Sequence, residues 1–246
     1  MDMAVRVARV GNYIVSVIAM VMILLMCAYG GYSLWDSYRI SHSAFLTNDL
    51  LKYKPSQGSS GENYSLEELM ALNPDTRGWL TIDDTHIDYP VVQGEDDMEY
   101  INMDVFGEFS LSGSIFLSCL NSPDFSDSYN LLYGHHMDNG GMFGDVMEFL
   151  DEGYFKSHQT GTLYLPHATY GITLFACIEA DGYDRLIYRP GRECEDMQEL
   201  LDYLKSSSTQ YRDIGVTADD QIIGMSTCVD AVTNGRAILF GRLDKE

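Results

Sequence analysis

Basic residues are scarce in this chain, and their scarcity argues against one broad class of function. The 246 residues include 15 Lys or Arg against 37 Asp or Glu, so the formal net charge is −22. A surface of that sign repels nucleic acid and anionic lipid headgroups and favours solubility. Acidic pairs at 83–84 and 96–97 lack the spaced oxygen ligands of a calcium-binding loop. We therefore interpret the charge as a solvated acidic surface on a protein that does not bind nucleic acid.

Cysteine is also sparse, and its spacing excludes the usual frameworks. The five cysteines, an odd number, match neither a zinc site nor a set of disulfides. Cys119 and Cys177 lie in apolar runs typical of strands, where a free cysteine usually acts as a small hydrophobic residue. Cys194 lies among acidic residues at an expected helix start, which predicts a raised thiol pKa. Cys27 falls in an apolar run near the N-terminus, which leaves Cys228 as the exception.

Long apolar runs are missing from the sequence except for one, the uncharged stretch from Val10 to Trp35. A run of ~20 apolar residues spans the hydrocarbon core of a bilayer. Arg6 and Arg9 precede this run and Asp36 follows it. By the positive-inside rule, the short N-terminal tail stays in the cytoplasm and everything after Trp35 is exported.

Two other interpretations of this run compete with an uncleaved anchor. A cleaved signal peptide could end at Ala28-Tyr29-Gly30, but the uncharged run continues past that site. A lipoprotein anchor at Cys27 would need a small residue where Met26 stands. We favour the anchor, which divides the chain into a cytoplasmic tail at 1–9, a transmembrane segment at 10–35, an extracellular linker at 36–63 and a folded domain at 64–246.

The folded domain has a mainly β pattern. Ser56–Gly61 is rich in Gly and Ser, as flexible linkers are. Ser65 and Glu68 form a capping-box pattern for a helix that ends at Asn73-Pro74. Short apolar runs broken by turn residues then predict strands near 79–82, 86–92, 113–118, 129–134, 161–166, 170–179, 221–228 and 236–243. Helical segments are expected at 142–149 and 193–205. Many short, closely spaced strands indicate a single sandwich or closed barrel.

Two of these strands are expected to bring a thiol and a guanidinium together. An apolar strand delivers Cys228 at its end, and after a polar turn the next strand opens with Arg236. A neighbouring cation stabilises the thiolate, which is the reactive form of cysteine. The guanidinium also offers fixed donors to an oxyanion. The pattern by itself also fits a buried structural thiol and a surface arginine.

A histidine at the exit of another apolar strand, His135, supplies a third element. A Cys–His pair that is distant in sequence but adjacent in the fold is the usual arrangement of a thiol acyltransferase. Three alternatives stay open: a loop histidine satisfied by backbone, a functional His136 instead, or a metal site with Asp138. For the metal no third ligand is evident in the sequence, and we expect none.

At these residues the chain resembles the class B sortases. Ser226-Thr227-Cys228 is similar to the end of the sortase signature Thr-Leu-x-Thr-Cys, and Arg236 falls where the family's catalytic arginine begins the last strand. The histidine region of that class is similar to Tyr133–Met137 and Gly141–Gly144 here. Its opening strands are similar to Gly78–Leu80, Ile87–Gly94 and Gly113–Leu117, and its helix before the cysteine strand is similar to 193–205. The signature's Thr-Leu is Gly224-Met225 here, which raises a question of local packing.

The resemblance implies a fold and a reaction. The fold is a closed eight-stranded β-barrel of the sortase type, with an N-terminal helix and an extra helix before the cysteine strand. The enzyme is a cysteine transpeptidase that cuts a C-terminal sorting signal of a secreted protein after threonine. Cys228 is then the nucleophile, His135 the acid/base and Arg236 the oxyanion stabiliser. Ser226, Thr227 and Tyr188 are the implied substrate-binding residues, and no cofactor is implied.

The resemblance also implies partners and a location. The acceptor is an amine of a peptidoglycan precursor or of a pilin lysine. The protein is expected in the plasma membrane of a Gram-positive bacterium, crossing it once, with the catalytic domain outside. Two alternatives are kept: a cysteine hydrolase or protease that uses the same Cys–His pair, and a non-enzymatic membrane-tethered binding module.

Overall fold

The computed structural model describes residues 2–43, 48–55, 63–194, 196–228 and 234–245. The chain forms two compact units, Met1–His42 and Ser43–Glu246. The first unit consists of helix α1 (Asp2–Ser43). Its segment Met3–Tyr38 is apolar and long enough to cross a membrane. No residue in the most hydrophobic part of this segment is buried by the rest of the described chain. This helix contains the run that the sequence predicts as an anchor.

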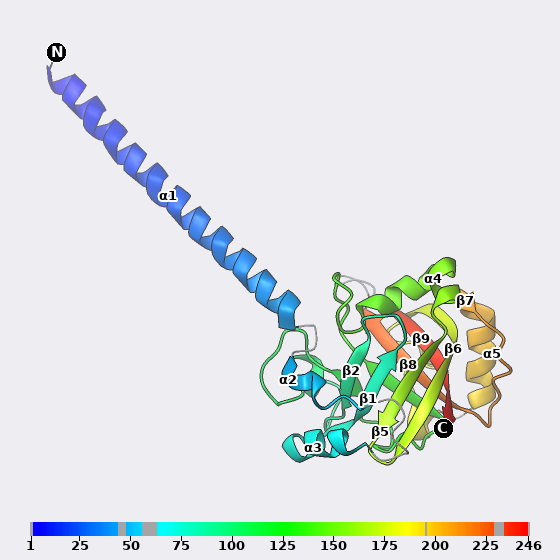
Figure 1. Ribbon diagram of the computed structural model, residues 1–246. Helices are drawn as coiled ribbons and strands as arrows, with labels where there is room; N and C mark the ends of the chain where they lie inside the picture. The colour runs from blue at the N-terminus through cyan, green and yellow to red at the C-terminus, as the bar shows by residue number, and fades with distance from the viewer. Residues whose placement is uncertain (1, 44–47, 56–62, 195, 229–233, 246) are drawn as a thin grey trace. The chain divides into compact units, whose positions relative to one another are not determined.

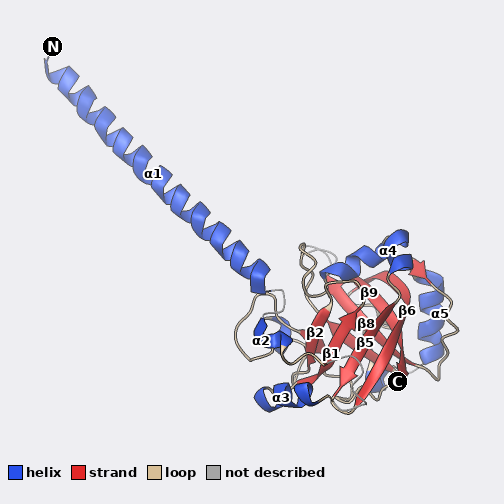
Figure 2. Ribbon diagram, viewed as in Figure 1, coloured by secondary structure: helices blue, strands red, loops and turns tan. Residues whose placement is uncertain are grey.

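The second unit is built on a closed barrel of eight strands (Figure 2). The strand order is β5-β1-β2-β3-β4-β8-β9-β6, and β6 pairs again with β5 to close the barrel. The strands are β1 (Thr76–Ile82), β2 (Asp88–Val92), β3 (Ile115–Leu117), β4 (Tyr129–Tyr133), β5 (Thr160–Leu165), β6 (Ala168–Asp181), β8 (Gln221–Cys228) and β9 (Gly235–Lys245). All eight strands predicted from the sequence are therefore present. A two-residue strand, β7 (Gln210–Tyr211), pairs with β6 and was not predicted.

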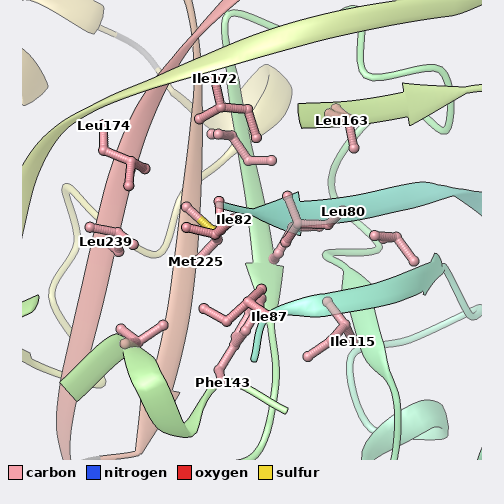
Figure 3. Close-up of a cluster of buried hydrophobic side chains, with 14 of the residues drawn as sticks. Leu80, Ile82, Ile87, Ile115, Phe143, Leu163, Ile172, Leu174, Met225 and Leu239 are labelled. Atoms are coloured by element: carbon pink, nitrogen blue, oxygen red, sulfur yellow. The ribbon is translucent and has the colours of Figure 1, made fainter. Parts of the chain in front are cut away.

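The barrel interior is filled by alternate residues of these strands. Side chains in a strand point to opposite faces in turn, so Ile223 and Met225 of β8 join the interior cluster while Ile222 packs in a second cluster on the other face. Figure 3 shows Met225 and Leu239 among the interior side chains, close to Phe143 and Ile82. Because β4 and β8 run parallel and β8 and β9 antiparallel, the ends of β4 and β8 and the start of β9 meet at one end of the barrel.

Helix α5 (Met197–Ser207) covers the outside of the barrel beside β6 (Figure 1). Its leucines at 200, 201 and 204 pack with Phe175 and Phe240 in the second cluster. The Asp196 carboxylate caps the helix by accepting from the backbone N–H groups of Gln198 and Glu199. The predicted helix before the cysteine strand is confirmed, although its α-helical part begins later than 193, after a short 3-10 turn, η3 (Gly191–Glu193).

The N-terminal helix is confirmed as α3 (Tyr64–Leu72), but its predicted cap is wrong. Asn63, not Ser65, precedes the helix, and no side chain caps it. Asn63 is held by the barrel instead. Its Nδ2 donates to the Leu165 carbonyl oxygen at 2.7 Å, and its backbone N–H donates to the Pro166 carbonyl oxygen at 3.0 Å. Attachment to the β5–β6 turn therefore sets where α3 begins.

The other helical segments are short. The helix predicted at 142–149 is a 3-10 helix, η2 (Gly144–Leu150), followed by an unpredicted α4 (Glu152–Ser157). Met142 has a positive φ of 54°, so regular helix cannot include it. The remaining two are α2 (Asn48–Leu51) and η1 (Glu99–Ile101).

Part of the segment expected as a linker packs on the barrel. Tyr53 is 8% exposed and joins a cluster with Leu66, Leu69 and Trp79. α1 itself continues to Ser43. The Gly/Ser-rich stretch at 56–61 lies outside the described residues.

The cysteines differ from expectation at one position. Cys177 is fully buried in the barrel, as predicted, and this burial raises the pKa of its thiol. Cys119 is exposed, because β3 ends at Leu117 and Cys119 falls in the turn that follows. The prediction that Cys119 acts as a buried hydrophobic residue is therefore wrong.

Candidate active site

The candidate residues come together through strand register. Tyr133 at the end of β4 pairs with Ser226 in parallel β8, and the Gly134 N–H donates to the Ser226 carbonyl oxygen at 3.2 Å. Cys228, two residues beyond Ser226, is the register partner of Arg236 at the start of β9. The backbone positions of His135, Cys228 and Arg236 therefore lie on three adjacent strand ends.

A cleft of about 310 Å³ opens at this end of the barrel. Five residues singled out from the sequence line it: the acid/base candidate His135, the oxyanion candidate Arg236, and the binding candidates Tyr188, Ser226 and Thr227. For Cys228 the structure describes only the backbone. This backbone ends β8, directly after Ser226 and Thr227.

His135 is held in place by backbone groups. Its Nε2 lies 2.8 Å from the carbonyl oxygen of Ile101, and its own carbonyl oxygen accepts from the Phe143 N–H at 3.0 Å. Gly134 before it is required by packing, since a Cβ there would lie 2.4 Å from Ile115 and 2.7 Å from Phe143. The Gly-His sequence therefore places the imidazole at the cleft wall while Phe143 fills the core behind it.

His136 has a different environment. Its Nε2 lies 3.4 Å from the Asp138 carboxylate, and its buried Nδ1 has no hydrogen-bond partner among the described residues. His136 also forms an isolated β-bridge with Met142. Unlike His135, it is not among the residues that line the cleft.

Arg236 offers its guanidinium to the cleft from the other side. Its Nη1 donates to the Gly235 carbonyl oxygen at 3.2 Å, and no carboxylate of the described residues forms a salt bridge with it. Gly182 lies against it, since a Cβ at that position would stand 3.7 Å from Arg236 Cζ. A guanidinium without a fixed carboxylate partner keeps donors available for a negatively charged group.

The three candidate binding residues form one side of the cleft. Tyr188 Oη lies 2.9 Å from Ser226 Oγ, and its ring stacks on that of Tyr133 with centroids 6.3 Å apart. Thr227 is 2% exposed, and its Oγ1 has no hydrogen-bond partner within the described part of the chain. A buried hydroxyl of this kind is a donor and acceptor available to a bound group.

Sequence reasoning did not identify four further residues that line the cleft. They are Asp97, Ile101, Phe116 and Tyr133, and Asp97 is the only carboxylate among the described lining residues. Asp97 accepts from the Cys119 N–H at 2.7 Å and from Ser118 Oγ at 3.1 Å. Burial raises the pKa of the Tyr133 phenol, and the charge of Asp97 adds to this. The sequence signal here was one acidic pair in a loop, which does not identify a cleft residue.

The departure from the signature at Gly224 has a packing explanation. A Cβ at Gly224 would lie 3.1 Å from Tyr129 Oη and 3.2 Å from both Leu131 Cδ1 and Phe240 Cε1. The phenol of Tyr129 thus occupies the space that a threonine side chain at 224 would need. Tyr129 and Gly224 form a complementary pair below the cysteine end of β8.

Comparison with known proteins agrees with this fold. No protein-family profile matches the chain. Sortase B of Listeria monocytogenes is 33% identical over 180 residues, covering 72% of this chain and 73% of that protein. A class B sortase of Streptococcus pyogenes that is involved in pilus biogenesis is 40% identical, with a TM-score of 0.67, covering 72% of this chain and 97% of that chain.

A further solved structure, the Staphylococcus aureus sortase B–substrate complex, is 28% identical with a TM-score of 0.70, covering 76% of this chain and 87% of that chain. Identity and coverage of this extent, together with the closed eight-stranded barrel, indicate common descent and a common reaction type. The chain belongs to the class B sortases and is a cysteine transpeptidase.

Proposed function

We propose that this sortase cleaves a C-terminal sorting signal after threonine at the cleft between β4, β8 and β9, with Cys228, His135 and Arg236 as its catalytic residues. The observation that carries the proposal is the register of the three strand ends. It sets the Cys228 position opposite Arg236 and next to the strand that leads into His135. The cleft that holds His135 and Arg236 supplies room for an extended peptide.

The proposed steps are balanced in atoms and protons. The Cys228 thiolate attacks the carbonyl carbon of that threonine, and Arg236 stabilises the tetrahedral oxyanion. The C–N bond breaks, and His135 protonates the leaving amine, which gives a thioester on Cys228. The acceptor amine then attacks the thioester, transfers a proton to His135 and releases the cysteine thiolate. A new amide bond replaces the one that was broken.

The other described cysteines of the barrel unit are poor nucleophiles, which supports Cys228. Partial desolvation, together with the charge of Asp97, raises the thiol pKa of the exposed Cys119, and burial raises the thiol pKa of Cys177 and Cys194. The raised pKa predicted for Cys194 is thus confirmed, mainly through burial. A raised pKa leaves less thiolate near neutral pH.

The test of the proposed function is turnover of candidate sorting peptides. Purified residues 43–246, which form a compact unit, are mixed with a small panel of such peptides, with and without an amine acceptor. Cleavage after threonine and an amide product are expected, and the amine should suppress hydrolysis. If cleavage occurs but the amine leaves the products unchanged, the acyl group goes to water and the enzyme works as a cysteine hydrolase.

We propose a pilin lysine, rather than a peptidoglycan amine, as the acceptor. Support comes from the Streptococcus pyogenes relative involved in pilus biogenesis, which is 40% identical to this chain. Supplying a lysine-containing pilin segment and a peptidoglycan stem-peptide amine in competition discriminates the two acceptors. An amide product with the stem-peptide amine alone would reject the pilin lysine.

We also propose the cellular arrangement. The tail at 1–9 is cytoplasmic, 10–35 crosses the plasma membrane of a Gram-positive bacterium, 36–63 connects the anchor to the domain, and 64–246 is the extracellular catalytic part. Support comes from the apolar helix α1 and the arginines at its start. Protease added to intact protoplasts should remove the domain, and a protected domain would contradict this topology.

A further inference from the structure

Large apolar side chains are exposed on one loop beside the cleft. Met98 is 71% exposed, Phe106 44%, Phe109 76% and Leu111 48%. We name these four residues the apolar tip. The same loop contributes Asp97 and Ile101 to the cleft wall. Four large exposed apolar side chains within 14 residues of one loop are more than the scattered single ones that a soluble surface carries, and larger exposed patches mark contact sites for a membrane or a protein.

The loop that carries the tip is built by specific hydrogen bonds. The Asp104 N–H donates to the Glu108 carbonyl oxygen at 2.8 Å, and the Ser110 N–H to that of Asn102 at 3.0 Å. A β-bridge joins Met103 to Phe109. These bonds make a tight hairpin that exposes Phe106 and Phe109, with the exposed carboxylate of Glu108 between them in the sequence.

The hairpin is also fixed to the barrel unit from below. Asn73 Nδ2 donates to the Val105 carbonyl oxygen at 2.8 Å, and Ser114 Oγ to that of Met103 at 2.8 Å. Val105 is only 3% exposed, whereas its neighbour Phe106 is 44% exposed. The exposure of the tip is therefore a property of a fixed loop with a buried base.

The base of the tip is where the chain enters the barrel unit. Val105 and Tyr100 lie in the same hydrophobic cluster as Tyr53, and Leu50 packs against that cluster. After the uncharged run, α1 extends over 36–43, ~12 Å of helix at 1.5 Å per residue. Seven further residues lead to Leu50, and these reach at most ~25 Å.

We propose that the apolar tip inserts into the headgroup region of the bilayer that holds α1, on the outer side. The short tether keeps the cluster beneath the tip within reach of the bilayer surface. Insertion of the tip then sets the orientation of the cleft, because Asp97 and Ile101 belong to the same loop. This inference rests on the membrane anchoring proposed above.

Charge limits the depth and the lipid preference of this contact. Three carboxylates of the loop bind its own backbone: Asp96 accepts from Met98 N, Glu99 from Glu95 N, and Asp104 from Phe106 N. The chain as a whole carries −22, so anionic headgroups repel it. Insertion is therefore shallow, ~5–10 Å, and strongest with uncharged lipids. A tether gives a local concentration of about millimolar, so a weak contact suffices.

The test uses the full chain in phosphatidylcholine vesicles with and without brominated acyl chains, which quench tryptophan. Trp35 lies in α1 and is changed to Phe, while Trp79 is fully buried and gives a constant background. Phe109→Trp reports on the tip. Tyr183→Trp is the matched control, because Tyr183 is 79% exposed but is not part of the tip.

The expected result is a blue shift and a loss of emission in brominated vesicles for Phe109→Trp, with neither for Tyr183→Trp. Addition of phosphatidylglycerol should reduce the loss at low salt. Equal quenching of both reporters would overturn the proposal. Quenching of neither reporter would also overturn it, provided that flotation shows the chain to be bound to the vesicles. So would an emission change that appears only when a secreted substrate protein is added, since the tip would then dock protein.

Two further measurements separate this inference from the proposed function. Sorting-peptide turnover is measured on the same variants in detergent and is expected to be unchanged, because Phe109 does not line the cleft. Quenching without turnover would reject the proposed catalytic residues and leave the tip standing. Failure of the chain to float with vesicles would reject the anchor, and the inference with it.

Discussion

The backbone N–H of Gly134 donates to the carbonyl oxygen of Ser226 at 3.2 Å, and this bond joins the strand that leads to His135 to the strand that ends at Cys228. It extends the parallel β4–β8 ladder by one residue past Tyr133. The relative placement of the proposed base and nucleophile is therefore set by rigid backbone. The loop that carries Asp97 and Ile101 completes the cleft, while the strands set the register.

Cys228→Ala is expected to abolish turnover and leave the fold intact, since no other group replaces the thiol. Cys177→Ala should retain activity and lower the free energy of unfolding by ~1–3 kcal/mol, the cost of a small cavity. Peptide cleavage and urea unfolding of both variants provide the measurement. Comparable loss of activity in folded Cys119→Ala or Cys177→Ala would reject Cys228 as the nucleophile.

His135→Asn should be inactive, while His136→Asn should keep most activity. The reason is that His135 lines the cleft and His136 faces Asp138. General acid–base catalysis typically contributes ~10²–10⁴-fold, so the kinetics of the two single variants with one peptide will separate them. An inactive His136→Asn beside an active His135→Asn reverses the assignment.

Arg236→Ala should lower turnover by at least ~10²–10³, the usual effect of removing an oxyanion donor. Arg236→Lys should also be badly impaired, because lysine keeps the charge but loses the fork of donors. Circular dichroism must accompany the kinetics, since an unfolded barrel would imitate a catalytic defect. A folded Arg236→Ala enzyme with near-normal turnover would remove Arg236 from the site.

Tyr129→Phe is expected to raise the free energy of unfolding by ~1 kcal/mol, because the buried Tyr129 hydroxyl has no partner among the described residues and an unpaired buried polar group costs ~1–3 kcal/mol. Gly224→Ala should lower it, since the new methyl would lie 3.1 Å from Tyr129 Oη. Denaturant unfolding of each variant tests the pair. An unchanged midpoint for Gly224→Ala would mean that the Tyr129 ring moves without cost.

Stability should fall in alkaline solution. Burial raises the pKa of Tyr89 to about 12, against ~10 for tyrosine in an unfolded chain. The folded state favours the neutral phenol, so its contribution is complete below pH ~10 and is lost as the pH rises towards 12. Urea midpoints measured between pH 8 and pH 11.5 should decline, and the decline should be smaller in Tyr89→Phe. An equal decline in that variant would assign the effect to other tyrosines.

Local sequence signals predicted the elements of this fold well where one interaction dominated. Eight apolar runs bounded by turn residues became eight barrel strands, because burying alternate side chains favours the same conformation as the local β propensity. The prediction failed where a distant contact competed with a local one. Ser65 and Glu68 match a capping box, but the hydrogen bonds from Asn63 to the β5–β6 turn determine the start of α3.

What the sequence by itself determined is the set of reactive residue types and the strand ends that carry them: a cysteine, a histidine and an arginine, each next to an apolar strand. Only the tertiary structure decided which residues face them. Asp97 and Ile101 enter the cleft wall, and Tyr129 fills the space beside Gly224. These contacts join residues tens of positions apart, and their geometry depends on how the closed barrel sets strand register. No local pattern encodes such a distance, so the cleft walls and the apolar tip appear only once the barrel is closed.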